Sequence, residues 1–267
     1  MQHADALITA LILIFFAIIL LCIWRARRGH TPYVRPIGGI AALEEAIGRA
    51  TELGKPAYFA MGGTDLKAIQ THAALSILSH VARLSARLRT HLIALVRMPD
   101  VYPYTEEIMR EAYKAEGVLD LLDTEDQVRY LSHDSIVYAT TAGRLIEDTK
   151  AGCAMFFGQF DFTSLLMAEP GAQAGVIQIA GDPGLAQIPF FVCTCDYTVI
   201  GEEFYAGGAY LSRDPGMRGS LLSQDSIKVI FAGIILVGVI ALHLKGFGPD
   251  WLTNAAQRVF DYLKLYK

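Results

Sequence analysis

Hydrophobic and polar residues recur along the middle of the chain with two periods, one typical of helices and one typical of buried strands. In residues 40–53, apolar side chains return every three to four positions and charged side chains lie between them, as on an amphipathic helix. Ala57–Met61 is a short apolar run without charge, which favours a buried strand. The same reasoning predicts strands at 57–61, 91–98, 128–131, 153–158, 176–180 and 188–194, and helices at 40–53, 65–88, 104–116, 135–150, 162–167 and 198–211.

Strands and helices therefore alternate through one domain, which we expect to span residues 29–217. Alternation of this kind predicts parallel strands joined by right-handed helical crossovers. The expected fold is an α/β, Rossmann-like three-layer sandwich with a mostly parallel sheet. The order of the strands does not follow from the sequence.

A longer apolar run, Ala6–Trp24, contains no charged residue and is followed by Arg25, Arg27 and Arg28. A helix of this length rises about 28 Å, close to the thickness of a bilayer core. A cleavable signal peptide is the alternative, but it requires a basic start, and the first five residues hold no Lys or Arg. We therefore predict a retained transmembrane anchor over residues 1–28, with Trp24 at the membrane interface.

A second apolar run, Val229–Leu242, has Lys228 and Lys245 at its two ends. Lysines in these positions can extend toward the membrane surfaces, so we predict a helix at 218–245 that continues into a second span. A buried helix of the domain is the alternative. Residues 246–267 have the spacing of an amphipathic helix that lies on the membrane or on a neighbouring subunit.

The arginines after the first run predict an orientation, because Lys and Arg collect on the cytoplasmic side of membrane proteins. The expected protein spans the inner (cytoplasmic) membrane twice, with its N-terminus outside and its main domain in the cytoplasm. A net charge of −4 makes nucleic acid an unsuitable partner. Four cysteines in a cytoplasmic domain argue against a disulfide framework.

Three consecutive stretches resemble an uncharacterised family of prokaryotic membrane-anchored proteins that carry a domain of unknown function. They are Arg35–Ile40, Glu44–Ala50 and Glu52–Pro56. The resemblance implies an N-terminal anchor and a single module rather than a fragment of an enzyme. It implies no activity, cofactor or catalytic residue.

Polar residues follow several predicted strands, where open parallel sheets bind their ligands. The candidate ligand-binding residues are Gly62, Gly63, Thr64, Asp65, Asp161 and Asp182. Carboxylates there could hold a divalent cation, and the glycines could present backbone N–H groups to a phosphate. The alternative is structural, because Asp65 and Asp161 precede predicted helices and could cap them. Neither G-x-G-x-x-G nor G-x-x-x-x-G-K-[ST] occurs in the chain.

Two further groups of residues have reactive types but weak patterns. His133, Asp134 and Ser135 are adjacent in sequence and cannot form a catalytic triad by themselves. Cys193 and Cys195 would face the same way on a strand. They could bind a metal or cycle between redox states, and the alternative is a pair of buried, inert thiols.

The absence of catalytic motifs, the tethering at both ends and the apolar composition of the chain together predict a structural role. The expected function is a membrane-anchored scaffold or accessory subunit that self-associates into a larger membrane assembly. Its partners would be the lipid bilayer, copies of itself and other subunits of that assembly. The alternative is an enzyme or sensor that binds a small ligand, a nucleotide or a divalent cation, at the carboxyl ends of the strands. No catalytic residue, bound metal or cofactor is predicted.

Overall fold

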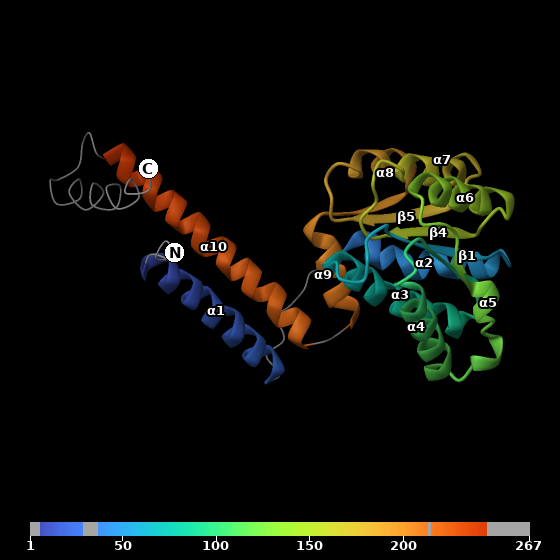
Figure 1. Cartoon of the computed structure of the whole chain (residues 1–267), viewed down its shortest axis with the longest axis horizontal. Coiled ribbons are helices and arrows are strands. Elements are labelled where there is room, and N and C mark those ends of the chain that lie inside the picture. The colour runs from blue at the N-terminus through green and yellow to red at the C-terminus, as the bar shows by residue number, and fades with distance from the viewer. Residues whose placement is uncertain (1–5, 29–36, 213–214, 245–267) are drawn as a thin grey trace. The chain divides into compact units, whose positions relative to one another are not determined.

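The computed structural model describes residues 6–28, 37–212 and 215–244 (Figure 1). The chain divides into two compact units. One contains Met1–Pro32 together with Pro215–Lys267, and the other contains Tyr33–Asp214.

The Tyr33–Asp214 unit is built on a six-stranded sheet in the order β3-β2-β1-β4-β5-β6. Every neighbouring pair of strands is parallel. The strands are β1 (Ala57–Met61), β2 (Leu92–Val96), β3 (Val128–Tyr130), β4 (Cys153–Phe157), β5 (Ile177–Asp182) and β6 (Tyr197–Ile200).

Helices cover both faces of this sheet and make the three layers visible in Figure 1. One face carries α2 (Gly38–Glu52), α3 (Ile69–Leu88), α4 (Tyr102–Ala115) and α9 (Glu202–Ser212). The other carries α6 (Ser135–Asp148), α7 (Ser164–Gln173) and α8 (Ile188–Thr194). Two short turns, η1 (Leu119–Leu121) and α5 (Thr124–Gln127), lead into β3.

Side chains of each central strand point alternately to the two faces of the sheet, and each face has its own hydrophobic cluster. In β1, Phe59 belongs to the cluster beneath α2, α3 and α4, whereas Tyr58 and Ala60 belong to the cluster beneath α6 and α7. All five residues of β1 are buried. Burial on both faces explains why the strand is a continuous apolar run instead of an alternating one.

The Rossmann-like α/β part of the prediction agrees with this architecture, but one strand assignment is wrong. Residues 188–194 form helix α8. The last strand is β6, which occupies the start of the helix predicted at 198–211, and helix α9 begins only at Glu202. Pro189 lies in the first turn of α8, where its missing N–H costs nothing, whereas it would remove a ladder hydrogen bond from a strand. Phe191 is the buried member of the run, so a helix satisfies its hydrophobicity.

The second unit contains two long helices, α1 (Ala6–Arg27) and α10 (Pro215–Leu244), which pack against each other. The rings of Phe15 and Phe231 lie 5.2 Å apart. A Cβ atom at Gly219 would come within 2.8 Å of the Cα atom of Ile23. The absence of a side chain at this glycine therefore permits a close approach of the two helices.

The prediction of two transmembrane helices is wrong. Within residues 6–28, 37–212 and 215–244, no helix combines the length and the apolar character that crossing a membrane requires. Part of the apolar surface of α1 packs on α10. In addition, α10 includes Asp225 and Lys228, whose side chains lie 3.7 Å apart. We also predicted that the protein crosses the inner membrane twice, with its N-terminus outside. That prediction depended on the two spans and is wrong for the same reason.

The residues predicted to flank the spans have other positions. Arg25 and Arg27 belong to the last turn of α1, and the guanidinium of Arg28 lies 3.6 Å from the centre of the Trp24 ring. Lys245 and the amphipathic helix predicted at 246–267 lie outside the described residues.

Candidate functional site

The strand order places a topological switch point between β1 and β4, where doubly wound sheets bind their ligands at the carboxyl ends of the strands. Gly62 and Gly63 follow β1, and the segment from Gly158 to Asp161 follows β4. The structure therefore brings together two segments that are about a hundred residues apart in the sequence.

The two segments close against each other instead of leaving a crevice. The N–H of Gly62 donates to the carbonyl of Phe157 at 3.0 Å, and the N–H of Gly63 donates to the carbonyl of Gln159 at 2.8 Å. A Cβ atom at Gly62 would lie 2.5 Å from the backbone N of Gln159. Both glycine N–H groups are thus bonded within the chain, which argues against the phosphate cradle considered for them.

Thr64 and Asp65 belong to a loop that is held by its own hydrogen bonds. The Thr71 hydroxyl donates to the carbonyl of Asp65 at 2.7 Å and lies 2.9 Å from the Thr64 hydroxyl. Helix α3 begins only at Ile69, and no side chain caps it. The expectation that Asp65 caps this helix is therefore wrong.

An ion pair that the sequence did not reveal joins the ends of β2 and β4. Nη1 of Arg97 lies 2.9 Å from Oδ2 of Asp161, and Nε of Arg97 donates to the carbonyl of His133 at 3.1 Å. The Arg97 side chain is only 13% exposed, and it lies against Gly63, where a Cβ atom would overlap Nη1. The guanidinium therefore helps to close the switch point.

Asp182, at the carboxyl end of β5, is 1% exposed. Its two carboxylate oxygens accept the N–H groups of Phe160 at 2.9 Å and Gly184 at 2.6 Å. Burial raises the pKa of the Asp182 carboxyl to about 6, and the two backbone N–H groups oppose this increase. Asp182 thus tethers two loops at this edge and titrates nearer to neutrality than an ordinary aspartate.

Asp134 and Ser135, two of the other reactive residues, make hydrogen bonds within the chain. The side chain of Asp134 accepts the N–H groups of Ile136 and Val137 and so caps α6, as such residues commonly do. Ser135 lies 3.4 Å from Asp161. Among the described residues, no cluster of three or more His, Cys, Asp or Glu side chains could hold a metal ion.

Cys193 lies in the last turn of α8, and Cys195 is the residue that follows this helix. The expectation that both thiols share one face of a strand is therefore wrong. Cys193 is exposed and Cys195 is half-buried. Burial raises the pKa of the Cys195 thiol to about 12, and the same cause raises the pKa of Cys153 to about 12. The thiols of Cys153 and Cys195 are therefore protonated at neutral pH and weakly reactive.

Large apolar side chains are exposed around the closed switch point. Phe162 is 68% exposed and Leu185 is 73% exposed. We name as the carboxyl-edge apolar surface the exposed residues that begin α6 and α7 or follow β4 and β5: Ile136, Val137, Phe162, Leu166 and Leu185.

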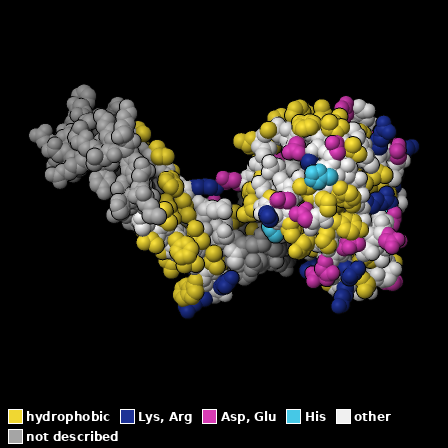
Figure 2. All heavy atoms as spheres, in the orientation of Figure 1, with side chains coloured by type: hydrophobic (Ala, Val, Ile, Leu, Met, Phe, Trp, Pro, Cys, Tyr) yellow, Lys and Arg dark blue, Asp and Glu magenta, His cyan; other side chains and the backbone are white. Residues whose placement is uncertain are grey.

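Hydrogen bonds connect the segments that carry these residues. Ser135 at the start of α6 bonds to Asp161 after β4. Ser164 at the start of α7 bonds to Gln187 before α8 at 2.6 Å. Figure 2 shows hydrophobic side chains beside acidic and basic ones on the visible face of this unit. Periodicity gave no signal for this surface, because its residues come from separate segments.

The fold and this edge define the class: a Rossmann-like α/β domain whose switch point is closed by its own backbone. Within that class, the chain belongs to the family DUF6754, a domain of unknown function, whose profile matches residues 1–251. The expectation of a family with no assigned function is thereby confirmed. No curated protein and no solved structure matches the chain.

Proposed function

We propose that the protein is a self-associating scaffold and that its copies meet through the carboxyl-edge apolar surface. The observation that carries the proposal is the exposure of Phe162 and Leu185 on loops that hydrogen bonds hold in place. Contiguous apolar surface on a protein commonly marks an interaction site.

The magnitude of the hydrophobic contribution supports association. Burying a large apolar side chain completely contributes roughly 1.5–3 kcal/mol. Scaled by their exposed fractions, the five residues offer about 4–8 kcal/mol per copy. In a symmetric contact both copies contribute, giving about 8–16 kcal/mol. Association costs about 4–15 kcal/mol. The hydrophobic free energy of this surface is therefore comparable to the cost of pairing two copies.

The closed switch point favours this proposal over the alternative of a small-ligand enzyme or sensor. The N–H groups of Gly62 and Gly63 are bonded to backbone carbonyls, and both oxygens of Asp182 accept backbone N–H groups. Asp161 is paired with Arg97. These residues of the predicted ligand site already have partners within the chain.

The prokaryotic origin implied by the sequence resemblance remains a prediction.

Photo-crosslinking of the full-length chain in cells tests the proposal directly. A photoreactive phenylalanine analogue replaces Phe162, and the crosslinked species are identified by mass spectrometry. We expect a covalent product between two copies of this chain. The control places the analogue at Leu119, which is also exposed but belongs to η1. Crosslinking of two copies from Leu119 and none from Phe162 would overturn the proposal.

Mass photometry of the purified full-length chain provides a second test. The double variant Phe162→Asp, Leu185→Asp introduces two charges that a contact would have to bury, so we expect single copies. Leu119→Asp is the matched control and should assemble like the wild type. A wild type that remains a single copy over the whole concentration range would also refute self-association.

A further inference from the structure

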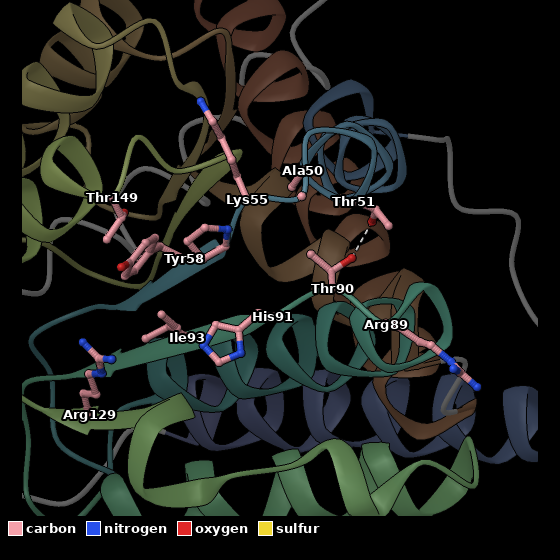
Figure 3. Close-up of a pocket in the computed structure, with 12 residues that line it drawn as sticks. Ala50, Thr51, Lys55, Tyr58, Arg89, Thr90, His91, Ile93, Arg129 and Thr149 are labelled. Carbon is pink, nitrogen blue, oxygen red and sulfur yellow. Dashed lines mark hydrogen bonds between the residues drawn. The ribbon is translucent and has the colours of Figure 1, made fainter.

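A pocket of about 480 Å³ lies at the other edge of the sheet, where β1, β2 and β3 begin (Figure 3). Its volume is within the range of roughly 300–1,000 Å³ that is typical of small-molecule sites. Tyr58, Ile93 and Arg129 line it from the three strands, and Thr149 lines it from the end of α6. The pocket is entirely separate from the carboxyl-edge apolar surface.

Four basic side chains and no acidic one line this pocket: Lys55, Arg89, His91 and Arg129. A carboxylate outside the lining contacts two of these side chains. Asp126 pairs with Arg129 and lies 3.1 Å from Nε2 of His91. Neither Lys55 nor Arg89 has an ion pair with any residue that the structure describes. The pocket therefore has an excess of positive charge.

Tyr58 provides a second, independent observation. Its side chain is 1% exposed, and its hydroxyl has no hydrogen-bond partner among the described residues. Figure 3 shows the ring directed toward Thr149, on the side of the pocket away from Arg89. The large majority of buried polar side-chain atoms are hydrogen-bonded, so this unpaired hydroxyl at the pocket wall could donate to a ligand that binds there.

Three helix ends explain why basic side chains are found at this pocket. They do not explain why the Tyr58 hydroxyl is unpaired. Helices α2, α3 and α6 all end beside this pocket, and cations are favourable at helix C-termini. The terminal carbonyls are already capped, for example by the N–H of Lys55 on Ala50 and the N–H of Thr90 on Ser85. None of these caps uses the Tyr58 hydroxyl.

We infer that this pocket binds a small organic anion that carries a phosphate group. The phosphate oxygens accept hydrogen bonds from the Tyr58 hydroxyl and from Arg129, and the flexible Lys55 and Arg89 side chains fold toward the anion from the rim. Phosphate is the anion for which arginine and lysine are best suited. The apolar side chains of Pro56 and Ile93 contact the organic part.

Isothermal titration calorimetry of the full-length chain with sodium pyrophosphate tests this inference, with sodium chloride at matched ionic strength as the reference. We expect saturable binding to the wild type. Arg129→Gln and Lys55→Gln should each weaken it about tenfold, the size of one lost charged hydrogen bond. Lys67→Gln is the matched control, because Lys67 is exposed after the opposite end of β1, and it should bind like the wild type.

Tyr58→Phe separates binding from folding. Removing a buried hydroxyl without a partner should leave the melting temperature of the empty protein unchanged or raise it. The same variant should bind pyrophosphate about tenfold more weakly. A lower melting temperature would mean that the hydroxyl has a partner within the protein, which overturns the inference. Binding that is not saturable, or that Lys67→Gln weakens as much as Arg129→Gln does, would overturn it as well.

Discussion

Replacing Asp182 by asparagine should change how the stability of the protein depends on pH. The carboxyl has an ordinary pKa of 3.8, and burial raises it to about 6 in the folded protein. The folded state therefore holds a proton at pH values where the unfolded state has released it. The stabilisation from this proton is fully present below pH 4 and is lost as the pH rises through 6.

The magnitude follows from the two pKa values. Over the whole transition the wild type loses about 3 kcal/mol relative to a variant that stays neutral. Between pH 4.5 and 7.5 the change is about 2 kcal/mol. The Asp182→Asn side chain stays neutral, so the difference in unfolding free energy, wild type minus variant, should fall by this amount over that range.

Urea unfolding followed by far-ultraviolet circular dichroism measures this difference. Tryptophan fluorescence is unsuitable, because Trp24 and Trp251 both lie outside the Tyr33–Asp214 unit. Asp126→Asn is a control whose difference from the wild type should stay nearly constant between pH 4.5 and 7.5. Hydrogen bonding to Arg129 lowers the pKa of Asp126, so its contribution is present above the ordinary pKa and is lost as the pH falls. A difference for Asp182→Asn that stays flat from pH 4.5 to 7.5 would refute the reasoning.

Two further substitutions, one of them with a matched control, test the packing of the core and of the closed switch point. Gly62→Ala places a Cβ atom 2.5 Å from the backbone N of Gln159 and should cost about 1–3 kcal/mol of unfolding free energy. Gly48→Ala, inside α2 with no atom within 4 Å, should instead add about 0.5–1 kcal/mol, and equal effects of the two in urea unfolding would contradict the closure. Tyr138→Phe removes hydroxyl bonds to the carbonyls of Met61 at 2.7 Å and Leu95 at 3.1 Å and should lower the urea midpoint by the equivalent of about 1–2 kcal/mol. An unchanged midpoint would show that those carbonyls find other partners.

Much of the fold could be predicted because its signals are local. The runs that became β1, β2 and β4 are apolar on both faces, and glycine or proline interrupts the chain near them. The run at 188–194 gave the wrong element because a short apolar stretch has the same composition in a strand and in a helix. Packing of Phe191 against the sheet, with the residues on either side exposed, and Pro189 in the first turn favour the helix.

The candidate site was less predictable, since its residues meet only after folding. Arg97 and Asp161 are 64 positions apart, and no spacing rule connects them. Gly62 and Gly63 were correctly placed after a strand, but their N–H groups are taken by the loop after β4. The apolar run at Ala6–Trp24 predicted a membrane span, whereas the structure pairs its helix with α10.

Sequence alone determined most of the helices and the buried strands β1, β2 and β4, because those choices depend on side chains within one or two turns of each other. It also determined that the strands run parallel, because each is separated from the next by a helix. Tertiary structure decided the strand order, the closure of the switch point and the unpaired hydroxyl of Tyr58. These features depend on contacts between residues distant in the chain, and the hydrogen bonds and burial that define them exist only once the layers have packed.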